Sequence, residues 1–224
     1  MNELMLFKSD TKPVEYIEAP DKDRLKKGVS IWLKSRITGL KLLPTTRQQI
    51  IHDRDILLIE WLWNTGMRIS DALSIKFKDI DMGKEIVTFI VKKRSRPGKP
   101  FVHSISLDKG ILFEVQRYKE RIKGNPEDRL FPMTRMNAHD NLDKYAELAG
   151  FPETIKTTKK GLITKSHFHA HILRHSMCMN DLMNGIQPEV TQFRAGHASL
   201  DTTINTYRKM NVNIEKIIRN GIKQ

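Results

Sequence analysis

The chain has 224 residues, and its 39 Lys and Arg against 26 Asp and Glu give a formal net charge of +13. With 39% hydrophobic and 29% charged residues it can bury a core, which argues against wholesale disorder. The single cysteine, Cys178, excludes an intrachain disulfide and a Cys-based zinc site. The excess positive charge favours a polyanionic partner, most often nucleic acid.

The N-terminal part of the chain is polar and weakly patterned. Residues 1–45 read as a short N-terminal segment before a domain at 46–224. A helix is predicted at 52–63, where apolar residues are dense, and Gly66 follows as a stop signal. A short helix is predicted at 70–78. Neither a signal-length apolar run at the start nor a stretch of roughly 20 apolar residues is present, so we expect a cytoplasmic protein without membrane contact.

Two β-rich runs, 85–91 and 101–107, predict a β-hairpin with a long basic tip. A second basic segment, 157–166, is expected to be a loop. Neither cluster contains an acid, which favours phosphate contacts over simply solvated loops. The expected DNA-binding residues are Lys92, Arg94, Arg96, Lys99, Lys159, Lys160 and Lys165.

The remaining pattern is helical. Helices are predicted at 108–123, 137–149, 171–184, 188–195 and 201–210. A final amphipathic stripe is formed by Ile214, Ile217, Ile218 and Ile222. The expected fold class is therefore α+β, mainly α with a small antiparallel β-hairpin.

Unusual polar residues stand at the breaks between these helices. Arg68 follows the stop at Gly66, while His171 and Arg174 share one helical face because they are three residues apart. His197 follows a helix break, and Tyr207 comes ten residues later. Each has an ordinary explanation as a surface ion pair or a packing residue. Together with a basic hairpin they form a set suited to phosphoryl transfer.

Three motifs that carry these residues resemble the tyrosine recombinase (phage integrase) family. They are Thr-Gly-Met-Arg-Ile-Ser-Asp-Ala-Leu at 65–73, His-Ile-Leu-Arg-His at 171–175, and Gly-His-Ala-Ser-Leu-Asp-Thr-Thr at 196–203, followed by Tyr207. They occur in the family's order, and the resemblance covers roughly residue 46 to the C-terminus. It implies the catalytic fold of that family.

The resemblance also implies a role for each side chain. Arg68 and Arg174 would bind the non-bridging oxygens of a phosphodiester, and Tyr207 would attack phosphorus to form a covalent 3′-phosphotyrosine. His171 would be the base, and His197 would hydrogen-bond a phosphate oxygen. No cofactor or divalent ion is then required.

The family's general acid is a lysine on the hairpin. Lys92 and Lys93 both end the first predicted strand, where side chains alternate between the two faces, so only one should face the phosphate. Lys93 is the first choice, Lys92 the second and Lys99 the third. The histidines at 167, 169, 171 and 175 could suggest a metal site, but without nearby cysteines no metal is expected.

The family usually has a helical DNA-clamping domain of around a hundred residues before the catalytic one, and here about 45 residues precede it. That domain is expected to be reduced or absent. The favoured function is a site-specific DNA recombinase acting on double-stranded DNA and oligomerising on it, as a dimer to a tetramer. The alternatives are a non-catalytic DNA-binding regulator on the same fold and a topoisomerase of type IB.

Overall fold

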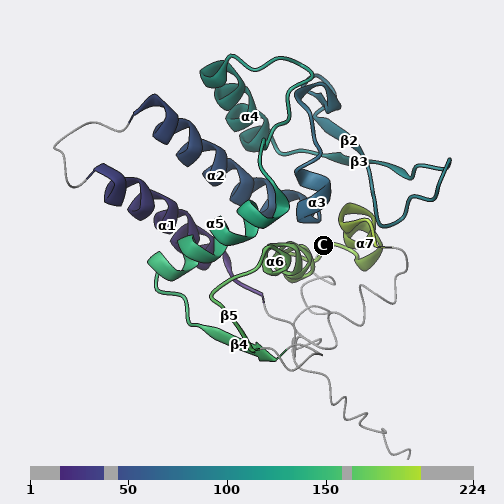
Figure 1. Ribbon diagram of the computed structural model, residues 1–224. Coiled ribbons are helices and arrows are strands. Elements are labelled where there is room, and N and C mark those ends of the chain that lie inside the picture. Colours follow the sequence, from purple (N-terminus) through teal and green to yellow (C-terminus); the bar gives the residue numbers. More distant parts are fainter. Residues whose placement is uncertain (1–15, 38–44, 158–162, 198–224) are drawn as a thin grey trace, which may run out of the picture.

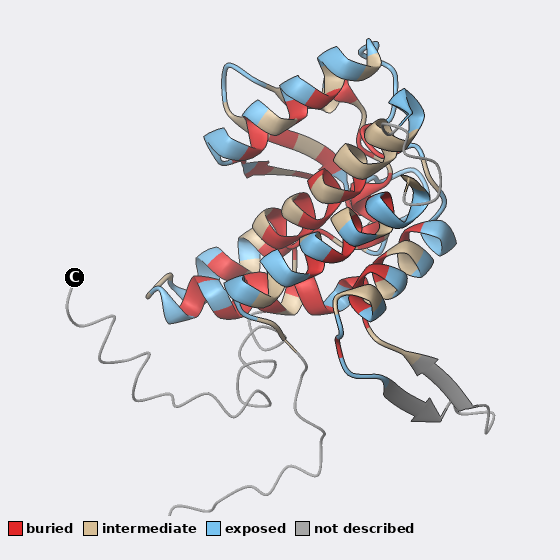
Figure 2. Ribbon diagram, turned by 90° about the vertical axis from the view of Figure 1, so that its left-hand side faces the viewer, coloured by how far each residue is buried: buried red, intermediate tan, exposed pale blue. Residues whose placement is uncertain are grey.

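The computed structural model describes residues 16–37, 45–157 and 163–197. Five longer helices make up most of this body, and a small antiparallel sheet lies at one end of it (Figure 1). The helices are α1 (Ala19–Ile37), α2 (Thr46–Thr65), α4 (Lys109–Ile122), α5 (Arg135–Leu148) and α6 (Ala170–Met183). Their buried faces turn inward and their exposed faces outward (Figure 2). The expected α+β class with few strands is confirmed.

Helix α2 lies at the centre and contacts α1, α4 and α6. It begins six residues before the predicted start, because Thr45 and Gln48 form a reciprocal capping box. Its buried side includes Leu58, Trp61 and Leu62. The helix ends at Gly66, as predicted, in a left-handed conformation.

The sheet has the order β1-β2-β3, with β1 at Ile80–Asp81, β2 at Ile86–Ile90 and β3 at Val102–Ser106. The predicted hairpin is confirmed, with Val87 opposite Ile105 and both side chains buried. The predicted helix at 70–78 is instead α3 (Ile69–Ala72) and a 3₁₀ turn, η1 (Phe77–Asp79). It is interrupted because the backbone at 75–77 hydrogen-bonds the backbone at 128–130.

The later helices follow the prediction to within two residues at each end, and α7 (Pro188–Ala195) matches it fully. The loop expected at 157–166 is wrong at both of its ends. Antiparallel strand β4 (Thr154–Thr157) runs into its start and strand β5 (Ile163–Ser166) forms its end, as their β-branched residues favour, while residues 158–162 lie outside the described ranges. In the described ranges no helix is both long and apolar enough to cross a bilayer.

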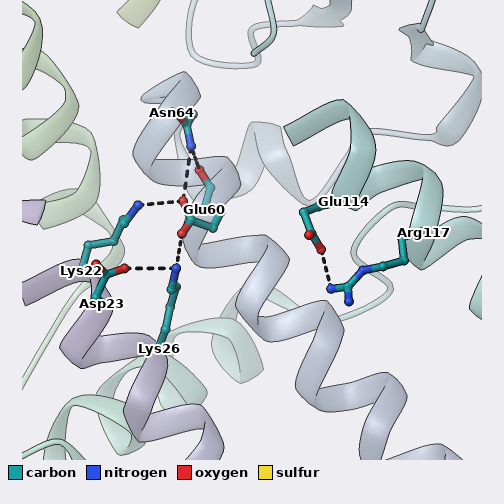
Figure 3. Close-up of polar contacts among 7 residues, drawn as sticks. All are labelled: Lys22, Asp23, Lys26, Glu60, Asn64, Glu114 and Arg117. Atoms are coloured by element: carbon teal, nitrogen blue, oxygen red, sulfur yellow. Dashed lines mark hydrogen bonds and ion pairs between the residues drawn. The ribbon is translucent and has the colours of Figure 1, made fainter. Parts of the chain in front are cut away.

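The sequence pattern did not predict α1, although Leu25, Val29 and Leu33 repeat every four residues and are buried in the structure. The helix lies against α2 and α5, and a Cβ at Gly28 would lie 2.0 Å from the Tyr145 carbonyl oxygen. Figure 3 shows Lys22 and Lys26 of α1 reaching Glu60 of α2. Leu25 and Val29 thus belong to the same core as α2. A domain boundary at residue 45 stays a prediction.

Candidate active site

The turn after α2 brings two of the predicted arginines together. Gly66 has φ of 60°, a left-handed conformation that favours glycine, and a Cβ there would lie 2.0 Å from Cε of Met177 on α6, so the end of the Met177 side chain would have to shift. Arg174 of α6 donates from Nη1 to the Gly66 carbonyl oxygen at 2.6 Å. Arg68, two residues beyond Gly66, occupies the N-cap position of α3 in an extended conformation, and its side chain makes no capping hydrogen bond. Arg174 therefore holds the backbone from which Arg68 projects.

The guanidinium of Arg174 is buried, with 3% of the residue exposed. Its Nη2 has no hydrogen-bond partner among the described residues. Burial, followed by repulsion from Arg68, lowers the pKa of Arg174. A buried donor without a partner costs free energy, and an anion accepting from it would remove that cost. The two arginines are thus arranged to receive an anion.

Three histidines surround the same place. His171 lies in the first turn of α6, and its ring packs edge-on against that of His175 with centroids 5.7 Å apart. Burial and then the charge of Arg174 lower the pKa of His171. Burial, Arg174 and Arg68 together lower the pKa of His197 to about 3. Both predicted catalytic histidines are therefore neutral at pH 7, the form in which His171 can accept a proton.

The hairpin lysines reach this site from the sheet. β2 ends at Ile90, so Lys92 and Lys93 lie in a turn, and strand alternation does not separate them. Both line one cavity of about 640 Å³. The backbone N–H of Lys92 points to Asp71 Oδ1 at 3.4 Å, and Asp71 is buried between α3 and the hairpin. Burial raises the pKa of Asp71, while the Lys92 N–H and Arg68 oppose that rise. The choice of Lys93 over Lys92 stays a prediction.

This cavity, called here the cationic pocket, also includes residues that the sequence pattern did not single out. Its lining consists of Arg68, Ile69, Ser70, Lys92, Lys93, Arg135, His139, His169 and His171. Arg135 and His139 come from the first turn and a half of α5. Arg135 lies two residues before the predicted start of this helix at 137, and none of the sequence motifs includes it. No acid is among these lining residues, so the pocket favours a polyanion.

Arg94 faces away from the cationic pocket. Its guanidinium lies over the Phe101 ring, with Cζ 3.6 Å from the ring centroid. Arg94 lines a second cavity, of about 380 Å³, together with His197. The same cavity holds His103, which is buried, and Phe193, which is 60% exposed. Phe193 lies on the outer side of α7, whose inner side is formed by Thr191 and Ala195.

The other predicted residues divide into two groups. Arg96 and Lys99 are exposed at the hairpin tip, where they form an isolated bridge. Tyr207, Lys159 and Lys160 lie outside the described residues, and so does the predicted helix at 201–210. Lys165 belongs to β5, where only the backbone is described. The structure thus brings together Arg68, Arg174, His171, His197 and the two hairpin lysines.

The fold of this body matches that of solved recombinase and integrase structures. The crystal structure of XerA recombinase matches with a TM-score of 0.63 at 17% identity, covering 96% of this chain and 66% of that one. The catalytic domain of bacteriophage HP1 integrase matches with a TM-score of 0.55 at 14% identity, covering 92% and 94% of the two chains.

Sequence comparison gives the family. The profile of the phage integrase family matches residues 40–213, so this chain belongs to that family. Tyrosine recombinase XerA of Pyrococcus horikoshii is 31% identical over 152 residues, which is 67% of this chain and 48% of that protein. Tyrosine recombinase XerC of Herpetosiphon aurantiacus is 28% identical over 199 residues, 86% and 60% of the two chains. The chain spans about half to three fifths of the length of these curated relatives.

Proposed function

We propose that this protein cleaves and rejoins DNA site-specifically through a covalent 3′-phosphotyrosine intermediate. The single observation that carries this proposal is the buried Arg174 guanidinium, with an unpartnered donor, beside Arg68 and the cationic pocket. A phosphodiester gains negative charge as it becomes five-coordinate, and two guanidinium groups stabilise that charge. The curated relatives are named tyrosine recombinases, which favours the enzyme over a non-catalytic regulator.

The proposed reaction exchanges one phosphodiester for another. The Tyr207 oxygen bonds to phosphorus while the bond from phosphorus to the 5′ oxygen breaks, so bond energy is conserved and no external energy source is needed. His171 accepts the phenol proton, and Lys93 donates a proton to the leaving 5′ oxygen. His197 hydrogen-bonds a non-bridging oxygen. Attack by the freed 5′ hydroxyl of another strand reverses these steps and releases Tyr207.

The proposed partner is double-stranded DNA. A solved XerH recombinase bound to its difH substrate and a Tn1549 transposon integrase bound to transposon end DNA both share this fold. Arg94, Arg96, Lys99, Lys159, Lys160 and Lys165 are proposed to contact phosphates around the site. We further propose a protein that acts in the cytoplasm, is monomeric in solution and assembles on DNA through the isoleucine stripe at 214–222.

A nicked suicide substrate tests this function. Duplexes enriched for binding from a random pool are nicked so that a short fragment diffuses away after cleavage and the adduct is trapped. The wild-type chain is expected to give protein-linked DNA on a denaturing gel. Tyr207→Phe should bind the same duplexes and give none, since phenylalanine has no nucleophilic oxygen. Specific binding by the wild type without any adduct would favour the regulator instead.

A further inference from the structure

Arg194 joins three elements at the back of the active site. It lies in the last turn of α7 and donates from Nη1 to Asp181 Oδ1 of α6. Its Nη2 donates to the Asn64 carbonyl oxygen at the end of α2, at 2.8 Å. Figure 1 shows α7 beside α6. One planar guanidinium thus spans an acid on one helix and a backbone carbonyl on another, a geometry that arginine fits and lysine does not.

The Asp181 carboxylate makes this contact more than a surface ion pair. Asp181 is 3% exposed and lies in the apolar cluster of α6 and α7, with Cys178 and Leu182. A buried carboxylate costs several kcal/mol unless it is paired. Burial raises the pKa of Asp181, and the charge of Arg194 opposes that rise. Apolar residues of similar volume often replace a buried ion pair without loss of stability, so stability alone is a weak reason for this pair.

The position of the contact supplies that reason. The last carbonyls of a helix have no partner within it, and Arg194 binds such a carbonyl of α2, that of Asn64. Arg174 binds the carbonyl of Gly66 in the turn that follows α2. The same stretch of backbone leads directly to Arg68. At the other end, Gly196 terminates α7, and His197 is held there by its N–H to the Gln192 carbonyl oxygen at 3.1 Å. A shift of α7 would therefore move His197 relative to Arg68 and Arg174.

We propose that Arg194 is a positioning residue for the cleavage reaction. By bridging Asp181 and the Asn64 carbonyl, it fixes the His197 end of α7 relative to the turn that carries Arg68. This inference rests on the proposed strand cleavage. Arg194 does not touch the DNA phosphate itself, and it acts through the placement of His197.

The key variant removes the bridge without leaving a buried charge. Arg194→Leu combined with Asp181→Leu replaces the ion pair by apolar groups, which should leave stability near that of the wild type. If Arg194 positions the site, this double variant should fold and bind DNA, but its single-turnover cleavage of bound, nicked duplex should fall by about 10²-fold, as expected for a misplacement of about 1 Å. A purely structural pair predicts cleavage at the wild-type rate.

Arg194→Lys covers the case in which the double variant does not fold. It keeps a charge for Asp181 but cannot bind both partners, so it should be folded and slower in cleavage with unchanged DNA affinity. The matched control is Arg117→Leu with Glu114→Leu, an ion pair on α4 remote from the site (Figure 3), which should cleave normally. Wild-type cleavage by Arg194→Lys would overturn the proposal.

A second readout does not depend on cleavage. In the wild type, burial and the charges of Arg174 and Arg68 lower the pKa of His197. If α7 moves away in the variants, NMR titration should show this pKa rising toward the ordinary value of about 6.5. An unchanged His197 pKa together with unchanged cleavage would leave Arg194 a structural residue. A wild type without cleavage, but with a variant-dependent His197 pKa, would reject the proposed function and keep the positioning.

Discussion

At the scale of single residues, the site combines buried charge with unsatisfied donors. Arg174 is held by one backbone carbonyl and keeps Nη2 without a partner among the described residues. Arg68 repels it, and both lower the pKa of His197. Such an arrangement is costly in the absence of an anion, and it pre-organises the donors to bind one. The functional groups are therefore distinguished by their environment, which residue type alone does not reveal.

The identity of the general acid is a prediction at this scale. Lys93→Ala should slow cleavage of a normal phosphodiester by about 10² to 10⁴-fold, because the 5′ oxygen leaves unprotonated. A substrate with a bridging 5′ sulfur should restore the rate, since a thiolate leaves without a proton. Single-turnover adduct formation measures both. If this sulfur substrate restored cleavage by Lys92→Ala and not by Lys93→Ala, the general acid would be Lys92. Arg174→Ala should stay slow on both substrates.

The acid stability of the protein depends on His197. With a folded pKa of about 3 and an unfolded pKa near 6.5, His197 contributes stability above pH 6.5 that is lost progressively as the pH falls toward 3. In His197→Gln the free energy of unfolding should decline less steeply between pH 7 and 5, by at most about 1.4 kcal/mol per pH unit. Urea titrations at both pH values measure this. Parallel curves for the two proteins would show that His197 is not neutralised by folding.

At the scale of elements, the turn between α2 and α3 determines the geometry of the site. Gly66 permits the left-handed conformation and the contact with Met177 of α6. The same turn presents its carbonyl to Arg174 and places Arg68 at the start of α3. The motif at 65–73 thus combines a left-handed turn, a carbonyl that binds Arg174 and the start of α3 in one short segment.

Gly66→Ala should therefore lower the free energy of unfolding by more than backbone strain alone would. Its Cβ would lie 2.0 Å from Met177 Cε, whereas Gly98, with a similar φ of 70°, has nothing within 4 Å of the added Cβ. Gly98→Ala is the control and should lower the free energy of unfolding by about 1 kcal/mol. Gly66→Ala should lower it further, by about 1 to 3 kcal/mol in all, because the end of the buried Met177 side chain must also shift. The urea midpoints of the two variants measure the difference, and equal losses would show that Met177 makes room for the Cβ without cost.

The sequence predicted the elements whose pattern is local. Helix α7, the hairpin and the stop at Gly66 follow from proline, glycine and apolar spacing. Helix α1 was not predicted because most of its residues are charged or polar and only a narrow apolar face, Leu25, Val29 and Leu33, is present. That face is buried by contacts with α2 and α5, which the local sequence does not reveal. Strands β4 and β5 were missed because basic residues alternate with Thr and Ile there.

The candidate site was predicted through motifs, and its remainder depends on contacts that are distant in sequence. Arg135 and His139 join the cationic pocket because α5 begins beside the hairpin lysines and the start of α6. The Arg194 bridge to Asn64 spans 130 residues. No local pattern marks such a pair.

At the scale of the whole molecule, the net charge of +13 predicts a polyanionic partner. Basic residues without a neighbouring acid line the cationic pocket. They also occur at the exposed hairpin tip and in the sequence segment 156–165. Polyanion binding should accordingly be strongly dependent on salt.

The basic hairpin and the 159–160 segment are predicted to contact phosphates. Arg96→Gln or Lys160→Gln should weaken binding to all DNA sequences and reduce the slope of log affinity against log salt by about 0.9 each. Fluorescence anisotropy over a salt series measures the slope. Arg117→Gln on α4 is the control and should leave it unchanged. If none of the hairpin or 159–160 variants altered the slope, these residues would not face the DNA.

The central claim is that the arginine, histidine and lysine groups of this site activate a phosphodiester toward Tyr207. Mass spectrometry of the proteolysed adduct tests it most directly, since the chain has 4 tyrosines and a nucleotide can be assigned to one of them. The predicted result is a nucleotide on the peptide that contains Tyr207, absent in Arg174→Lys. A nucleotide on Tyr16, Tyr118 or Tyr145, or cleaved DNA with no nucleotide on the protein, would contradict the account.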